Sequence, residues 1–251
     1  MIGFMAKRRT VRLVASDAVR VEWLRRVQAE YTSAAITQNF TLWLMQIAAS
    51  PDLIRGGLRI AGDEMAHARM SHRTYVAAGG DRAPELLRER LALRRNEAEP
   101  LEHEVTRVAV NTYCIGETVA VPLFKSLRQA CTIPIARRVL DRVLLDEVRH
   151  RDFGWAVLGW LLEGPLASPL RAVAVAALPR YFAKIQASYG AGQKHMTAML
   201  DADRVWGLMP PAEYAAIVER TLTRDWIPRF GAVGIDARRA WDESKRLSST
   251  G

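Results

Sequence analysis

Apolar residues along this chain recur at intervals of three and four rather than two, and Ala, Leu, Arg and Glu dominate its long segments. This pattern predicts helices and gives almost no strand signal, so we expect an all-α fold. Helix-capping and turn residues divide the sequence into helical segments. They include Ser16 with Asp17, Ser50 with Pro51, and Pro134. The expected helices cover about residues 17–49, 52–79, 84–95, 99–132, 134–164, 167–189, 191–206, 211–229 and 236–247.

Four of these helices are long enough to form a bundle, and the later ones are expected to pack outside it. We therefore expect one domain over residues 1–251, with a bundle core at 17–165 and a helical extension at 166–247. Two local irregularities are also expected. Gly56 and Gly57 could kink the second helix, and Pro122 with Gly116 should kink or bulge the third.

Two segments share the pattern Asp-Glu-x-x-His, at residues 63–67 and 146–150. On a helix, residues three apart lie on the same face about one turn apart, so Glu and His in this pattern can bind one metal together. Only two cysteines occur, Cys114 and Cys131, and both lie in segments expected to be helical. A thiolate cluster is therefore not expected, and any metal should be bound by oxygen and nitrogen.

Each motif follows a glutamate at a similar distance, Glu30 before the first and Glu117 before the second. In an antiparallel helix pair, residues equidistant from the turn lie at the same height. The midpoint of residues 117 and 147 is Thr132, which lies in an expected turn. The midpoint of residues 30 and 64 is Ile47, which lies three residues before the expected turn at Ser50. The half-site therefore occurs twice, which predicts a two-metal centre in the bundle core. Its expected ligands are Glu30, Glu64, His67, Glu117, Glu147 and His150.

The two motif aspartates are expected to support the histidines, because a metal-bound imidazole usually donates its second N–H to a carboxylate. We expect a crossed arrangement, with Asp63 beside His150 and Asp146 beside His67. Arg149 would balance the buried negative charge. No catalytic residue beyond the metal centre is expected.

The paired Glu and Asp-Glu-x-x-His motifs resemble those of the ferritin-like di-iron carboxylate superfamily. The resemblance covers about residues 17–165, and Asp-Glu-Val-Arg-His at 146–150 is most similar to its oxygen-activating branch, which includes the p-aminobenzoate N-oxygenases and the di-iron monooxygenases. It implies a ferritin-like four-helix bundle, two Fe ions with Mn as an alternative, O2 as co-substrate and an external electron donor. The implied activity is hydroxylation or N-oxygenation of a small organic or carrier-tethered substrate, in an oxidoreductase that is often dimeric.

Several positions near the expected ligands carry small or compact side chains, so space for a substrate is expected beside the metals. The candidate lining residues are Ala34, Ser71, Tyr113, Cys114, Val121 and Gly154. For Tyr113 and Cys114, core packing is the commoner explanation. Other readings stay open: a manganese catalase-like activity, hydroxylation of a tRNA base, or non-enzymatic iron binding as in ferritin.

The formal net charge is +9, with basic residues concentrated between Lys7 and Arg26. This charge could attract an acidic carrier protein or an anionic small molecule, whereas nucleic acid is the less favoured partner. The apolar runs end well short of a membrane span, and residues 1–9 lack the long apolar core of a secretion signal. A cytoplasmic protein without a membrane partner is therefore expected, and a homodimer is a candidate assembly.

Overall fold

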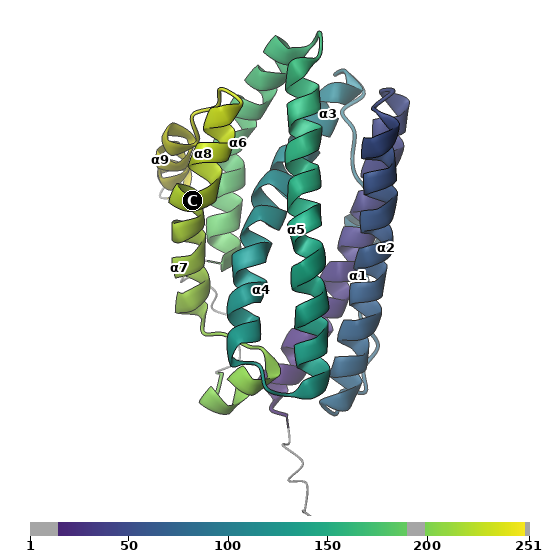
Figure 1. Cartoon of the computed structure of the whole chain (residues 1–251), viewed down its shortest axis with the longest axis vertical. Helices are drawn as coiled ribbons and strands as arrows, with labels where there is room; N and C mark the ends of the chain where they lie inside the picture. Colours follow the sequence, from purple (N-terminus) through teal and green to yellow (C-terminus); the bar gives the residue numbers. More distant parts are fainter. Residues whose placement is uncertain (1–14, 190–198, 249–251) are drawn as a thin grey trace, which may run out of the picture.

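The computed structural model describes residues 15–189 and 199–248, so the basic segment from Lys7 to Arg12 lies outside the described residues. The described part is all-α, as predicted. Four long antiparallel helical segments form a bundle (Figure 1). They are α1 (Asp17–Gln46), α2 (Pro51–Ala77), the continuous segment α3 (Leu101–Val108), η2 (Ala109–Glu117) and α4 (Thr118–Ala130), and α5 (Pro134–Glu163).

Serine caps set the starts of the first two helices. The Ser16 hydroxyl accepts from the Val19 amide at 3.2 Å, and the Ser50 hydroxyl accepts from the Leu53 amide at 3.4 Å. Both bonds satisfy a backbone N–H that has no partner within the helix. Pro51 and Pro134 stand in the first turns of α2 and α5, where a missing N–H costs nothing.

Gly56 and Gly57 allow close packing of α2, and the helix continues through them as one α-helix. A Cβ at Gly57 would lie 2.3 Å from Thr41 Oγ1, and one at Gly56 would lie 2.9 Å from Phe153 Cδ2. Only glycine therefore lets α2 approach α1 and α5 this closely at that level.

The third helical segment carries the predicted irregularity. Ala109–Glu117 forms a π-helix of nine residues, and Pro122 follows in the regular helix α4. A π-helix is rare and holds its residues by bonds to the fifth residue along, which changes the direction of the side chains it contains. Glu117 is its last residue, so the irregularity ends at a predicted ligand.

The C-terminal elements pack on one side of the bundle (Figure 1). They are α6 (Ala167–Tyr189), η3 (Asp201–Trp206), α7 (Pro211–Thr221), η4 (Leu222–Trp226), α8 (Ile227–Ala232) and α9 (Ala237–Ser248). α6 contacts η2 and α5, while α9 lies on α6 and α7 on α4. Phe182, Trp226 and Trp241 fill the layer between them, and the Trp226 indole donates to the Cys114 carbonyl at 3.1 Å. These buried aromatics join the extension to the bundle in one core.

Three helix predictions need correction. Residues 84–95 hold only the 3-10 turn η1 (Arg88–Arg90), because this segment is mostly exposed and charged and has no apolar stripe to bury. Of the expected helix 191–206, residues 191–198 lie outside the described residues and 201–206 are a 3-10 helix. The expected helix 211–229 extends to Ala232 and contains a second π segment, η4. Among the described helices, none is long and apolar enough to span a bilayer.

Candidate metal centre

Six buried side chains from four helical segments meet at one height in the bundle. Glu30 comes from α1, Glu64 and His67 from α2, Glu117 from the end of η2, and Glu147 and His150 from α5. Their ligand atoms form two groups, each with its members within 4.8 Å of one another: Glu30, Glu64, His67 and Glu147 in one, and Glu64, Glu117 and His150 in the other. The structure thus brings all six predicted ligand residues together, although it contains no ion.

Glu64 is shared by the two groups. Its Oε2 lies 3.4 Å from His67 Nδ1, and its Oε1 lies 3.3 Å from His150 Nδ1. Each oxygen of this carboxylate therefore faces a different imidazole. Glu147 also stands between the groups, with Oε2 at 3.7 Å from His150 Nδ1. Both carboxylates occupy positions from which they could bridge two cations.

Several ligand atoms in the cluster lack hydrogen-bond partners, which is unusual for buried polar groups. The unpaired atoms in the cluster include Glu64 Oε2, His67 Nδ1, Glu147 Oε2 and His150 Nδ1. A carboxylate or imidazole buried without a partner costs free energy unless something compensates for it. The unpaired atoms converge on the cluster interior, so the donor set fits divalent cations with oxygen and nitrogen ligands.

Without a cation the cluster would hold protons instead. Burial raises the pKa of Glu30 to about 7 and that of Glu147 to about 8, and it raises the pKa of Glu117 well above its usual range. Burial alone would lower the pKa of His67, but contacts with Glu30 and Glu64 outweigh it and raise that pKa to about 11. For Glu64, contacts with the two histidines outweigh burial and lower its pKa. Cations would therefore replace protons on binding.

Behind the imidazoles lies the crossed pair of aspartates. Asp146 Oδ2 is 2.9 Å from His67 Nε2, a hydrogen bond between α5 and α2. Asp63 Oδ2 is 3.6 Å from His150 Nε2, which is too long for a hydrogen bond. Both aspartates have the predicted neighbours, but only the Asp146 contact is a hydrogen bond.

Two arginines cover these aspartates. Arg149 Nη2 donates to Asp63 Oδ2 at 3.1 Å and to Asp146, as expected for a residue that balances their charge. Arg142 donates to Asp146 Oδ2 at 2.5 Å and to Asp63 Oδ1 at 3.3 Å. Sequence reasoning missed Arg142. Its spacing of four residues before Asp146 was the available signal, since such pairs meet on a helix.

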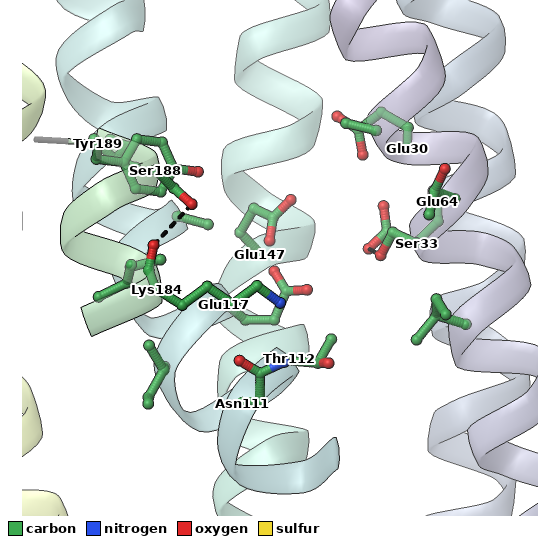
Figure 2. A pocket seen from close by; sticks show the side chains of 18 of the residues that line it. Glu30, Ser33, Glu64, Asn111, Thr112, Glu117, Glu147, Lys184, Ser188 and Tyr189 are labelled. Atoms are coloured by element: carbon green, nitrogen blue, oxygen red, sulfur yellow. Dashed lines mark hydrogen bonds between the residues drawn. The ribbon is translucent and has the colours of Figure 1, made fainter. Parts of the chain in front are cut away.

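A cavity of about 790 Å³ lies on the opposite side of the cluster. Its walls come from α1, from η2 with α4, and from α6, and they include Glu30, Glu64, Glu117 and Glu147 but neither His67 nor His150. Figure 2 shows Glu30 and Glu64 on one side of this space and Glu117 and Glu147 across it. The carboxylates therefore face the cavity, while the imidazoles are fully buried against the aspartates.

None of the six residues expected to line a substrate space lines this cavity: Ala34, Ser71, Tyr113, Cys114, Val121 and Gly154. Four of them follow a ligand by four residues. α1 and α5 run in one direction and α2 and the third helical segment in the other (Figure 1), so two of these positions lie on one side of the metal level and two on the other. Tyr113 and Gly154 pack on each other, since a Cβ on Gly154 would lie 2.2 Å from that of Tyr113. The Tyr113 hydroxyl donates to Thr37 Oγ1 at 2.8 Å in the core.

Sequence reasoning also missed the residues that do line the cavity. Ser33 lies one turn after Glu30, and its hydroxyl donates to Glu64 Oε1 at 3.0 Å. From α6 come Tyr181, Ile185 and Tyr189, which repeat at helical spacing. This spacing was visible in the sequence, but that α6 lies across this side of the bundle was not.

The chain has no match among models of known protein families, curated proteins or solved structures.

Proposed function

We propose that this protein is an O2-activating di-iron oxygenase of the ferritin-like superfamily, acting on a small organic substrate. The observation that carries the proposal is the cluster of four buried carboxylates and two imidazoles whose unpaired atoms converge beside a cavity. Oxygen and imidazole ligands tolerate both common valences of iron, and a bundle core is an established place for such a site.

The residues of the cluster would have separate roles in holding the cations. Glu64 and Glu147 lie where they can hold two cations side by side, and Glu30 and Glu117 each complete one end. His67 and His150 are kept in place from behind by Asp146, Asp63 and the two arginines. Iron bound there supplies the redox chemistry of O2 reduction, for which the substrate gives two electrons and an external donor the other two.

The cavity supports an enzyme rather than a purely structural metal site. A structural site is closed by its ligands, whereas a catalytic site leaves positions open to substrate. Here the carboxylates border a cavity whose volume falls within the usual range for small-molecule sites. α6 and Tyr214 of α7 contribute part of the cavity wall, so the C-terminal extension helps to form the proposed substrate site.

Anaerobic titration with Fe(II) tests the proposal. We expect two ions per chain, followed on exposure to O2 by a transient visible absorption band and by O2 consumption. His67→Ala should reduce the iron content or abolish the band, and His72→Ala, on the same helix but exposed, should behave as the unchanged protein. Failure to bind about two ions per chain would overturn the proposal. Binding without O2 reactivity would overturn the oxygenase activity and favour a manganese or storage role, and a cage-sized particle on gel filtration would identify storage.

A further inference from the structure

Outside the metal cluster, the walls of the cavity carry more cationic than acidic side chains. There are six cationic side chains, Arg25, Arg26, Arg90, Arg94, Arg107 and Lys184, against two carboxylates, Glu22 and Glu104. The cluster itself would contribute little net charge once loaded, because four carboxylates balance two divalent cations. A ligand in the cavity therefore meets a predominantly positive environment.

Arg26 is the most buried of these cations, with 4% of its surface exposed. Its Nε donates to Glu22 Oε1 at 2.9 Å, and its Nη2 donates to the Gly207 carbonyl at 2.7 Å. Its Nη1 is buried and has no hydrogen-bond partner among the described residues. The Arg26 side chain lines the cavity, and a small rotation of its guanidinium would let this unpaired donor bind an acceptor atom of a ligand.

The charge of Arg26 is only partly compensated. Glu22 also receives two hydrogen bonds from Arg25, at 2.7 Å and 2.8 Å, so one carboxylate serves two guanidiniums. Tyr189 and Tyr214 line the same cavity and stack with ring centroids 5.8 Å apart. Neither hydroxyl has a hydrogen bond to another described residue. The part of the cavity around Arg26, Tyr189 and Tyr214 thus offers one surplus positive charge and donors that lack acceptors.

The rest of the wall is apolar. Leu123, Phe124 and Leu127 from α4 and Ile185 from α6 also line the cavity. Arg26 precedes Glu30 by one helical turn, and helical side chains lean toward the N-terminus of their helix. The distance from the Arg26 group to the carboxylates is therefore roughly 6 to 12 Å.

We infer that the substrate is an organic anion: its carboxylate or similarly sized acidic group binds Arg26, Tyr189 and Tyr214, and an apolar body places the reacting atom beside Glu30 and Glu117. This inference rests on the proposed oxygenase function for the reaction, but the anion site is defined by its own residues. Acidic groups of small molecules suit it, because a guanidinium matches the geometry of a carboxylate.

Binding of matched probes tests the inference. Calorimetry would compare benzoate with benzamide, and hexanoate with 1-hexanol, on the full-length protein both metal-free and loaded anaerobically with Fe(II). We expect each anion to bind at least about tenfold more tightly than its neutral partner, because a hydrogen bond to a charged group is worth that much. Equal affinity of benzoate and benzamide for the unchanged protein would overturn the inference without any variant.

Variants locate the binding group. Arg26→Lys keeps the positive charge but removes the free Nη1 donor, and it should weaken benzoate binding about tenfold or more while leaving benzamide binding unchanged. Tyr214→Phe leaves the contacts of Arg26 intact and should weaken benzoate several-fold, so it serves if Arg26→Lys fails to fold. Arg69→Gln, an exposed change on α2, is the control for net charge. Unchanged benzoate binding in Tyr214→Phe and in folded Arg26→Lys would contradict the inference.

The two proposals fail in different ways. Two Fe(II) per chain with O2 consumption, but no preference for anions, would refute the substrate class and leave the oxygenase intact. Selective binding of benzoate through Arg26, without Fe(II) binding, would refute the oxygenase and support the anion site.

Discussion

Asp146 of α5 and His67 of α2 are joined by a hydrogen bond of 2.9 Å, whereas the symmetry-related pair, Asp63 and His150, is separated by 3.6 Å. The two halves of the site repeat in sequence but differ in this contact. Asp146 is fully buried, and Asp63 retains partial exposure of its side chain. The orientation of the His67 imidazole is therefore fixed more strongly than that of the His150 imidazole.

This difference predicts unequal effects of matched substitutions. Asp146→Asn should lower metal affinity about 10- to 100-fold, the usual effect of losing the partner of a metal-bound histidine. Asp63→Asn should have a smaller effect, since no hydrogen bond to His150 is lost. Competition with a coloured chelator measures both affinities, and Asp52→Asn, exposed at the start of α2, is the control. An equal loss in the two variants would show that the asymmetry has no consequence for binding.

The contact between Gly154 and Tyr113 predicts a cost in stability. A Cβ at Gly154 would lie 2.2 Å from the Tyr113 Cβ, so Gly154→Ala should lower the free energy of unfolding by about 1–3 kcal/mol through overpacking. Gly159→Ala, one and a half turns later in α5, meets nothing within 4 Å. It should instead stabilise the protein by about 0.5–1 kcal/mol, because alanine favours a helix. Urea unfolding of both variants would contradict this explanation if their effects were alike.

The protonation of the cluster predicts how the stability of the metal-free protein depends on pH. The native state keeps protons on Glu30 up to about pH 7 and on Glu147 up to about pH 8, whereas the unfolded chain releases them near pH 4.5. The raised pKa of His67, about 11, acts in the same direction above its usual value of 6.5. The native state thus binds more protons, so these groups make stability fall as pH rises from about 4.5 to 8 and beyond.

Thermal unfolding between pH 5.5 and 8.5 measures this dependence. In a chelating buffer the midpoint should fall as pH rises, whereas loading with Mn(II) or anaerobic Fe(II) should remove or reverse the trend, because bound cations replace the protons. The control is His67→Ala, in which the difference between the two conditions should shrink. A midpoint that depends on pH in the same way with and without metal would count against the cluster as a cation site.

The cavity predicts a route to the metals. Ile185→Trp on α6 should narrow the cavity and slow the removal of Fe(II) by a chelator several-fold, while the number of bound ions stays the same. Ala187→Trp adds similar bulk to an exposed position of the same helix outside the cavity wall and should leave the rate unchanged. Removal of iron at the same rate from both variants would mean that the ions are reached from elsewhere.

The parts of the fold and site that could be predicted from sequence are those with local causes. Glu64 with His67, and Glu147 with His150, share a helix face at a spacing of three, and Ser50 with Pro51 is a typical helix start. Residues equidistant from a turn meet at one height in any antiparallel pair, so Glu30 and Glu117 could be placed as well. Whether these residues bind iron remains a prediction.

The cavity could not be predicted because it depends on tertiary contacts. Its walls combine residues far apart in the chain, such as Arg26 on α1, Leu123 on α4 and Tyr189 on α6. Small residues near the ligands suggested the opposite side, but Tyr113 fills the room left by Gly154. Arg142 likewise resembles any exposed helical arginine until α2 brings Asp63 beside it.

The π segment Ala109–Glu117 has a consequence for the evolution of this chain. A π turn accommodates one residue more than an α turn, so the segment has the geometry of a helix that holds one extra residue without losing its ends. Losing any single residue between 109 and 116 would let the helix revert to regular geometry and would turn the side chains on one side of the deletion by about 100°. Relatives that keep Glu117 in place should therefore tolerate substitutions in this stretch far more readily than a change in its length.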